Sequence, residues 1–97
     1  MKKIDKIIMT IRQNRGVLAD KYGVDVVGIF GSYARGEQRR GSDIDLLAEI
    51  VKPVSLLELV GAELYLGEKL KAKVELVLKR NVREELREAI MTETVAV

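Results

Sequence analysis

The stretch GSYARGEQRRGSDIDL, residues 31–46, decides the fold of this 97-residue chain, because it joins two apolar runs and carries most of the polar chemistry. The run VDVVGIF (24–30) before it is rich in β-branched residues and bounded by glycines, which predicts a buried strand. The segment DIDLLAEIV (43–51) predicts a second strand, on which Asp43 and Asp45 point to the same face. A glycine-rich loop and two carboxylates are therefore expected at one end of a sheet.

Helical patterns flank these two predicted strands. Isoleucines recur at helical spacing near the N-terminus and predict an amphipathic helix over residues 3–21, stopped by Gly23. After the second strand, Ser55 and Glu58 form a capping-box pattern for a helix that ends near Lys71. The sequence thus predicts one helix before the pair of strands and one helix after it.

The last quarter of the chain predicts one more strand and one more helix. The segment KVELVLK (73–79) favours a strand, and Asn81 with Glu84 repeats the capping pattern before a short helix. The closing TETVAV (92–97) is apolar and uncapped, which predicts either a frayed tail or a strand that pairs with another chain. The predicted fold class is α/β (α+β), a small mixed sheet packed with helices, in a single domain over residues 1–97.

Composition limits the chemistry that the chain can perform. The sequence is 47% hydrophobic and 33% charged, which is typical of a globular protein, and it has no cysteine and no histidine. Disulfides, thiol nucleophiles, imidazole catalysis and the usual zinc sites are therefore excluded. The net charge of +2 is too small for a dedicated nucleic-acid binder. No apolar run is long enough to span a membrane, and we expect a cytoplasmic protein.

Asp43 and Asp45 form a candidate metal site. Residues two apart on a strand project from the same face, so both carboxylates can converge on one point. Two such charges repel each other in a site of reduced dielectric, unless a cation neutralises both. Hard oxygen ligands favour Mg²⁺, with Mn²⁺ as the alternative ion. Since Mg²⁺ on few carboxylates usually completes its shell with water and phosphate oxygens, the pair also predicts a phosphate ligand.

The preceding loop supplies candidate groups for that phosphate. Gly31 lets the backbone approach a ligand closely, and Ser32 offers a hydroxyl and can cap a following helical turn. Arg35, Arg39 and Arg40 bring positive charge to the same loop.

The order of these residues resembles the signature of a known family. A Gly-Ser pair, ten further residues and then DID, preceded by Ser42 and following a strand, is similar to the signature of the polymerase-beta-like nucleotidyltransferases, specifically the minimal nucleotidyltransferase group. The resemblance implies the palm fold of that superfamily and ATP or another NTP as substrate. It implies that Gly31 and Ser32 hold the terminal phosphates, and we expect Arg35 and Ser42 to belong to the same nucleotide-binding set.

The resemblance also implies that the aspartate pair binds two Mg²⁺ and that a third acid on a neighbouring strand binds one of them and activates the acceptor hydroxyl. The text VELV (74–77) puts Glu75 where the family usually has an aspartate. Its side chain is one methylene longer, and a displacement of about 1 Å in a positioned group can cost about a hundredfold in rate. The implied catalytic and metal-binding set is therefore Asp43, Asp45 and Glu75.

Two functions from different classes follow. The first is a Mg²⁺-dependent nucleotidyltransferase that moves a nucleoside monophosphate, AMP from ATP, to an acceptor hydroxyl by in-line displacement at the α-phosphorus. The resemblance implies an antitoxin whose partner is a helical HEPN-family toxin and whose acceptor is a tyrosine of that toxin. The alternative is a non-catalytic antitoxin or nucleotide-binding module that neutralises its partner by complex formation, which the Glu75 replacement keeps open. The sequence leaves a homo-oligomer open too.

Overall fold

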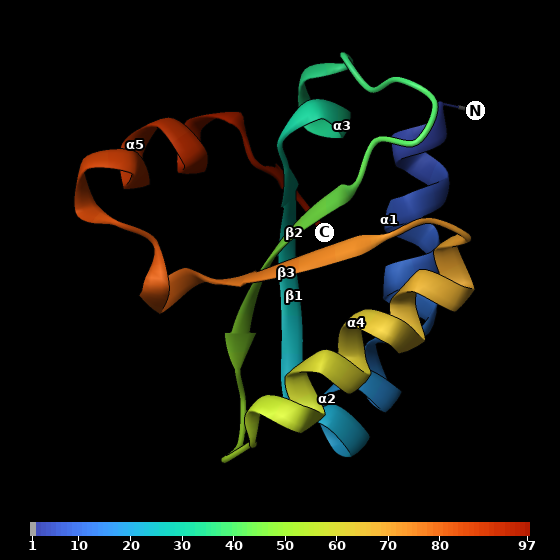
Figure 1. The fold of residues 1–97 in the computed structure, drawn as a ribbon, viewed down its shortest axis with the longest axis vertical. Coiled ribbons are helices and arrows are strands. Elements are labelled where there is room, and N and C mark those ends of the chain that lie inside the picture. The colour runs from blue at the N-terminus through green and yellow to red at the C-terminus, as the bar shows by residue number, and fades with distance from the viewer. Residues whose placement is uncertain (1) are drawn as a thin grey trace.

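A four-stranded mixed sheet organises residues 2–97, the part of the chain that the computed structural model describes (Figure 1). Its order is β3-β2-β1-β4. β1 pairs antiparallel with β2 and with β4, whereas β2 and β3 run parallel, so the predicted mixed sheet is confirmed. The strands are β1 (Val24–Phe30), β2 (Ile44–Ile50), β3 (Val74–Leu78) and β4 (Val95–Ala96).

Helices surround this sheet unequally. In Figure 1, α1, α2 and α4 lie together at one side of the strands, and α5 stands apart from them at the other side. None of the helices in residues 2–97 is long and apolar enough to cross a membrane. The helices are α1 (Lys3–Gln13), α2 (Arg15–Tyr22), α3 (Ser32–Arg35), α4 (Leu56–Leu70) and α5 (Glu84–Glu93), with a short 3₁₀ turn, η1 (Lys79–Asn81), before α5.

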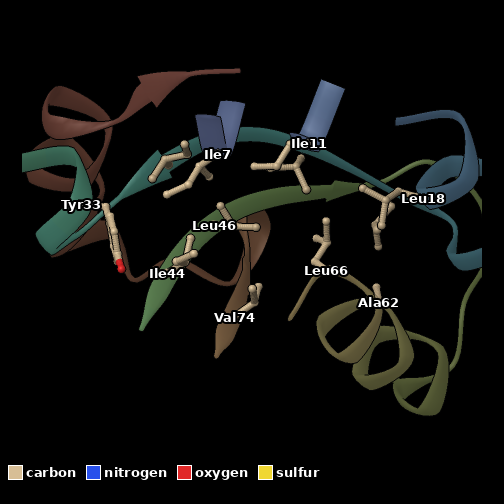
Figure 2. Packing of buried hydrophobic residues seen from close by; sticks show 12 residues of the cluster. Ile7, Ile11, Leu18, Tyr33, Ile44, Leu46, Ala62, Leu66 and Val74 are labelled. Carbon is tan, nitrogen blue, oxygen red and sulfur yellow. The ribbon is translucent and has the colours of Figure 1, made fainter. Parts of the chain in front are cut away.

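The hydrophobic core lies between the sheet and the layer of α1, α2 and α4 (Figure 2). Ile11 of α1, Leu46 of β2 and Leu66 of α4 are fully buried in it. Ile44 and Leu46 belong to this cluster, and because side chains alternate along a strand, Asp45 between them faces the opposite side of the sheet. Core packing therefore fixes which face carries the carboxylate.

The predicted N-terminal helix is in fact two helices that meet at Asn14. The Asn14 side chain donates a hydrogen bond to the Thr10 carbonyl at 2.7 Å and accepts one from the Tyr65 hydroxyl at 2.6 Å. Such local side-chain bonds compete with helical backbone bonds. The single helix predicted over residues 3–21 is therefore wrong at this residue, although its apolar positions face the core as expected.

The two predicted capping boxes have different outcomes. Ser55 caps α4 and Glu58 bonds back to the Ser55 backbone, as predicted. The second prediction is wrong, because Asn81 lies in the 3₁₀ turn and α5 begins at Glu84 without a side-chain cap.

The C-terminal segment forms a strand, β4, which pairs within the chain, with Val95 opposite Ile29 and Ala96 opposite Gly28, so the prediction of a frayed tail is wrong. Pairing of this edge strand with another chain stays a prediction. A side chain at residue 28 would overlap the Thr94 methyl group, so the glycine makes room for this segment. The pairing brings the end of α5 back to the end of β1.

Candidate functional site

An open cleft of about 610 Å³ lies where β1 ends and β2 begins. Its walls come from the end of β1, from α3 and the loop after it, from the start of β2 and from the end of α5. The loop and the aspartate pair belong to one stretch of sixteen residues in the sequence. In the structure, both therefore contribute to the surface of one cleft. The predicted site residues that line the cleft are Gly31, Ser32, Arg35, Ser42, Asp43 and Asp45.

Gly31 and Asp45 are in direct contact at the bottom of this cleft. β1 pairs with β2 so that Phe30 lies opposite Asp45, which puts the Asp45 side chain over the next residue. A β-carbon added at residue 31 would overlap the Asp45 carboxylate oxygen Oδ2, and the backbone there has φ +77°, which disfavours other residues. The glycine is therefore required both by the backbone conformation and by the aspartate.

Asp45 is the acid whose charge is most affected by its surroundings. Burial raises the pKa of Asp45, and the negative charges of Glu75 and Asp43 raise it further, while Arg35 acts in the opposite direction. Glu75 is the parallel-strand partner of Asp45 in the register, so the two residues lie about 4.8 Å apart across the sheet. A cation at this site would relieve the repulsion among the three acids.

Asp43 and Glu75 lie farther from the bottom of the cleft. Asp43 directly precedes β2, its side chain is 40% exposed, and it forms only a long contact of 3.9 Å with Lys73 Nζ. Glu75 is exposed on the edge strand β3 and does not line the cleft. Both carboxylates therefore have room to reorient toward a ligand.

The donor set fits a hard cation held by few protein ligands. Within residues 2–97, no three acidic, histidine or cysteine side chains form a ready-made metal cage. Mg²⁺ commonly binds one or two carboxylates and takes its other ligands from water and phosphate, which matches Asp43 and Asp45 beside an open cleft. The part of Glu75 in metal binding stays a prediction.

The arginines of the loop differ in their positions. Arg35 lines the cleft and donates to Glu37 through Nε at 2.6 Å and to Glu93 through Nη1 at 3.0 Å. These two hydrogen bonds raise the pKa of Arg35. Arg39 and Arg40 are exposed and do not line the cleft, so Arg35 is the loop arginine that faces it.

Ser42 holds the loop together as well as lining the cleft. Its hydroxyl accepts a hydrogen bond from the Arg39 backbone N–H at 2.8 Å. This bond closes the turn directly before Asp43 and sets the direction in which β2 begins.

Glu93 is a residue of the cleft that sequence reasoning missed. Its Oε1 accepts a hydrogen bond from the Gly31 backbone N–H at 3.0 Å, and its Oε2 accepts one from Arg35 Nη1 at 3.0 Å. No motif includes this residue, and it reaches the cleft only because β4 pairs with β1.

Comparison with known proteins identifies related sequences along nearly the whole chain. Residues 11–97 match the family profile of the Nucleotidyltransferase domain. The chain is 43% identical over 82 residues to a Methanocaldococcus jannaschii protein assigned as a protein adenylyltransferase, an alignment that covers 84% of each chain. It is 32% identical over 97 residues to protein adenylyltransferase MntA of Thermococcus cleftensis, covering 100% of this chain and 98% of that protein.

Solved structures share the fold as well. One, assigned as a minimal nucleotidyltransferase, superposes with a TM-score of 0.77 at 31% identity and covers 100% of this chain and 97% of the other. Another, from a toxin–antitoxin structure with AMP-PNP, has a TM-score of 0.69 at 25% identity and covers 99% of this chain and 72% of the other. The arrangement of sheet and helices around the cleft is therefore a known one.

Proposed function

The chain belongs to the nucleotidyltransferase domain family and is a transferase, and on this premise we propose that it moves AMP from ATP to a hydroxyl of a partner protein. The observation that carries the proposal is the meeting of the Gly31 backbone with Asp43 and Asp45 in one cleft. A phosphate chain bound there would touch backbone amide donors and carboxylate-held cations at the same time. We propose residues 1–97 as a single nucleotidyltransferase domain.

Phosphate binding is the task of the loop in this proposal. Gly31 has no side chain, so a phosphate can approach its backbone beside Asp45. Ser32 and Ser42 line the cleft with hydroxyl groups, and Arg35 adds a permanent positive charge. These four residues would orient the phosphate chain of the nucleotide with its α-phosphorus toward the aspartates.

Cation binding is the task of the aspartates. We propose that Asp43 and Asp45 hold Mg²⁺, in two positions with Glu75 assisting at one, and that Mn²⁺ can replace it. When bound, such ions neutralise charge on the phosphoryl oxygens and on the attacking and leaving oxygens. Burial raises the pKa of Asp45 most, and the negative charges of Glu75 and Asp43 raise it further; these neighbouring charges support the assignment.

The transfer itself exchanges one phosphorus–oxygen bond for another. The acceptor hydroxyl oxygen forms a bond to the α-phosphorus, the bond from that phosphorus to the β-phosphate oxygen breaks, and pyrophosphate leaves. The proton of the hydroxyl must go to a base. Glu75 is the candidate, because it shares the open face of the sheet with Asp45 and its exposure lets a large acceptor approach.

The acceptor is proposed to be a tyrosine of a helical HEPN-family toxin, with this chain as its antitoxin. The related structure with AMP-PNP is that of a toxin–antitoxin system, which supports a toxin as the partner. The surface of α4 supports binding of a protein, since Leu56, Leu57 and Leu64 are 77%, 80% and 68% exposed. ATP as the proposed substrate favours a cytoplasmic location.

A second candidate function is neutralisation of the partner without chemistry. The place of Glu75 outside the cleft favours this alternative, since a catalytic base must reach the hydroxyl that attacks the bound nucleotide. In the first function ATP is cleaved and its AMP is transferred to the partner, whereas in the second no part of the nucleotide is transferred.

The test uses two forms of labelled ATP. The complete chain is incubated with a HEPN-family toxin encoded beside its gene, Mg²⁺, and ATP labelled on either the α- or the γ-phosphate. Transfer of the α-label alone to protein is the expected result. Transfer of the γ-label would indicate a kinase, and a stable complex without any label would indicate the non-catalytic function.

A further inference from the structure

Glu93 places a carboxylate on the very groups that are proposed to bind phosphate. Its two oxygens accept hydrogen bonds from the Gly31 N–H and from Arg35 Nη1, each at 3.0 Å. A phosphate group presents oxygens of the same charge and similar spacing to such donors. Only one anion at a time can accept hydrogen bonds from both donors.

The position of Glu93 is set by the segment that follows it. Thr94 donates a hydrogen bond to the Ile90 carbonyl at 2.6 Å, and its methyl group occupies the space left free at Gly28. Val95 and Ala96 then pair with β1. We call residues 84–97, which comprise α5 and β4, the C-terminal arm.

The C-terminal arm is attached to the rest of the molecule by few interactions. None of the residues of α5 is buried, and its Leu86 and Met91 are 48% and 39% exposed. β4 contributes only two residues to the sheet. Segments with few buried apolar contacts open locally at a low cost in free energy, so the arm can move without unfolding the core.

Because Glu93 is negatively charged, a second anion in the cleft would weaken its contact with Gly31 and Arg35. The Glu93 carboxylate lines the same cleft as Asp43 and Asp45, so Arg35 is the cation that compensates it there. A bound polyphosphate would add further negative charge to the cleft and would repel this carboxylate.

We propose that Glu93 competes with the nucleotide's phosphates for the Gly31 N–H and Arg35, so that nucleotide binding requires the C-terminal arm to release this carboxylate. Glu93 is then a residue that sets nucleotide affinity, and any partner that holds the arm away from the cleft would raise that affinity. The inference rests on the proposed function, because it takes Gly31 and Arg35 as phosphate ligands.

Two substitutions separate competition from a purely structural role. Glu93→Gln keeps an oxygen for the Gly31 N–H but removes one of the two carboxylate charges that hold Arg35, the other being Glu37, and Glu93→Ala removes both contacts of Glu93. Glu88→Gln, at an exposed residue of the same helix, is the matched control. Binding of Mg²⁺–ATP and of inorganic triphosphate is measured by calorimetry for each complete chain.

Competition predicts tighter binding of both probes by the Glu93 variants, by about tenfold, which corresponds to about 1.4 kcal/mol. The control should bind as the parent chain does, and in transfer assays the Glu93 variants should show a lower KM for ATP with kcat unchanged.

Unchanged or weaker triphosphate binding by a folded Glu93→Gln chain, when the parent binds, overturns this inference alone. Failure of the folded parent chain to bind either probe overturns the proposed function together with it. If Glu93→Ala fails to fold, the Glu93→Gln result decides.

Discussion

Asp45 and Glu75 lie opposite each other on the parallel strands β2 and β3, and both side chains face away from the hydrophobic core. This relationship puts two carboxylates side by side on the sheet, with Asp45 lining the cleft and Glu75 next to it outside the cleft. Burial and the neighbouring acids raise the pKa of Asp45, so its charged form opposes folding. The cation proposed for this site would offset that loss of stability.

The raised pKa of Asp45 makes stability depend on pH. Because the folded state holds this proton more tightly than the unfolded state does, the favourable contribution is complete below the usual aspartate pKa of about 3.9 and is lost as pH rises through the raised value. In EDTA, Asp45→Asn should therefore stabilise the chain at neutral pH by about 1 kcal/mol and should give no gain at pH 3. Thermal unfolding at both pH values is the measurement.

Asp20→Asn is the matched control, since Asp20 is exposed on α2 and away from the cleft. It should leave the unfolding temperature unchanged. A neutral-pH gain in the control equal to that of Asp45→Asn would contradict the explanation.

A bound metal ion should offset the loss of unfolding free energy that the clustered carboxylates cause. We expect the proposed Mg²⁺ to bind the folded site and not the unfolded chain, so adding it to EDTA-treated protein should raise the unfolding free energy, by about 2.7 kcal/mol at a hundred times Kd. The effect should disappear in the Asp43→Ala/Asp45→Ala double variant. Calorimetric scans with Mg²⁺, with Mn²⁺ and with Na⁺ at matched ionic strength check this, and an equal response of the double variant would place the ion elsewhere.

Gly31→Ala should damage both the fold and the site. The substitution brings a side chain against the Asp45 carboxylate at a backbone φ of +77°, so a loss of about 1–3 kcal/mol in unfolding free energy is expected, together with loss of nucleotide binding. Gly36→Ala controls for the backbone alone, since Gly36 has φ +70° but nothing within 4 Å of an added β-carbon. Urea unfolding should show the larger loss for Gly31→Ala, and equal losses would mean that contact with Asp45 is unimportant.

Glu75 can be tested as the base by changing its charge and its length separately. Glu75→Gln should lower kcat by about 10²–10⁴-fold with little change in nucleotide Kd, because it removes proton transfer and leaves phosphate binding intact. Glu75→Asp, which introduces the aspartate that the resemblance implies at this position, should keep or improve activity. A Glu75→Gln chain with the parent's kcat would assign the base elsewhere.

Local signals in the sequence were enough to predict most of the fold and to predict that the loop and the aspartates lie at one end of the sheet. The Ser55–Glu58 capping box is made within one turn of chain, and Ile44 and Leu46 are buried on either side of the half-buried Asp45, so both features could be predicted from neighbours alone. The Gly-Ser pair and the aspartates converge because a short connection joins two antiparallel strands.

Features that depend on distant contacts could not be predicted in this way. Asn14 interrupts the first helix partly through the Tyr65 hydroxyl, a residue 51 positions later, and Glu93 reaches the Gly31 amide across 62 positions. Neither contact leaves a periodic pattern in the sequence. The missed carboxylate and the missed helix break therefore share one physical cause, which is tertiary packing.

The central claim is that the cleft of Gly31, Asp43 and Asp45 transfers AMP to a partner protein. The most direct measurement is the intact mass of a HEPN-family toxin encoded beside this chain's gene, after incubation with ATP, Mg²⁺ and either the parent chain or Asp45→Asn. Because Asp45→Asn is expected to be folded and more stable, its failure would report lost chemistry and not lost structure. We predict that the toxin gains one or more AMP groups with the parent chain and none with the variant. A toxin that stays unmodified in a stable complex with the parent chain, or is modified equally by both chains, would contradict the account.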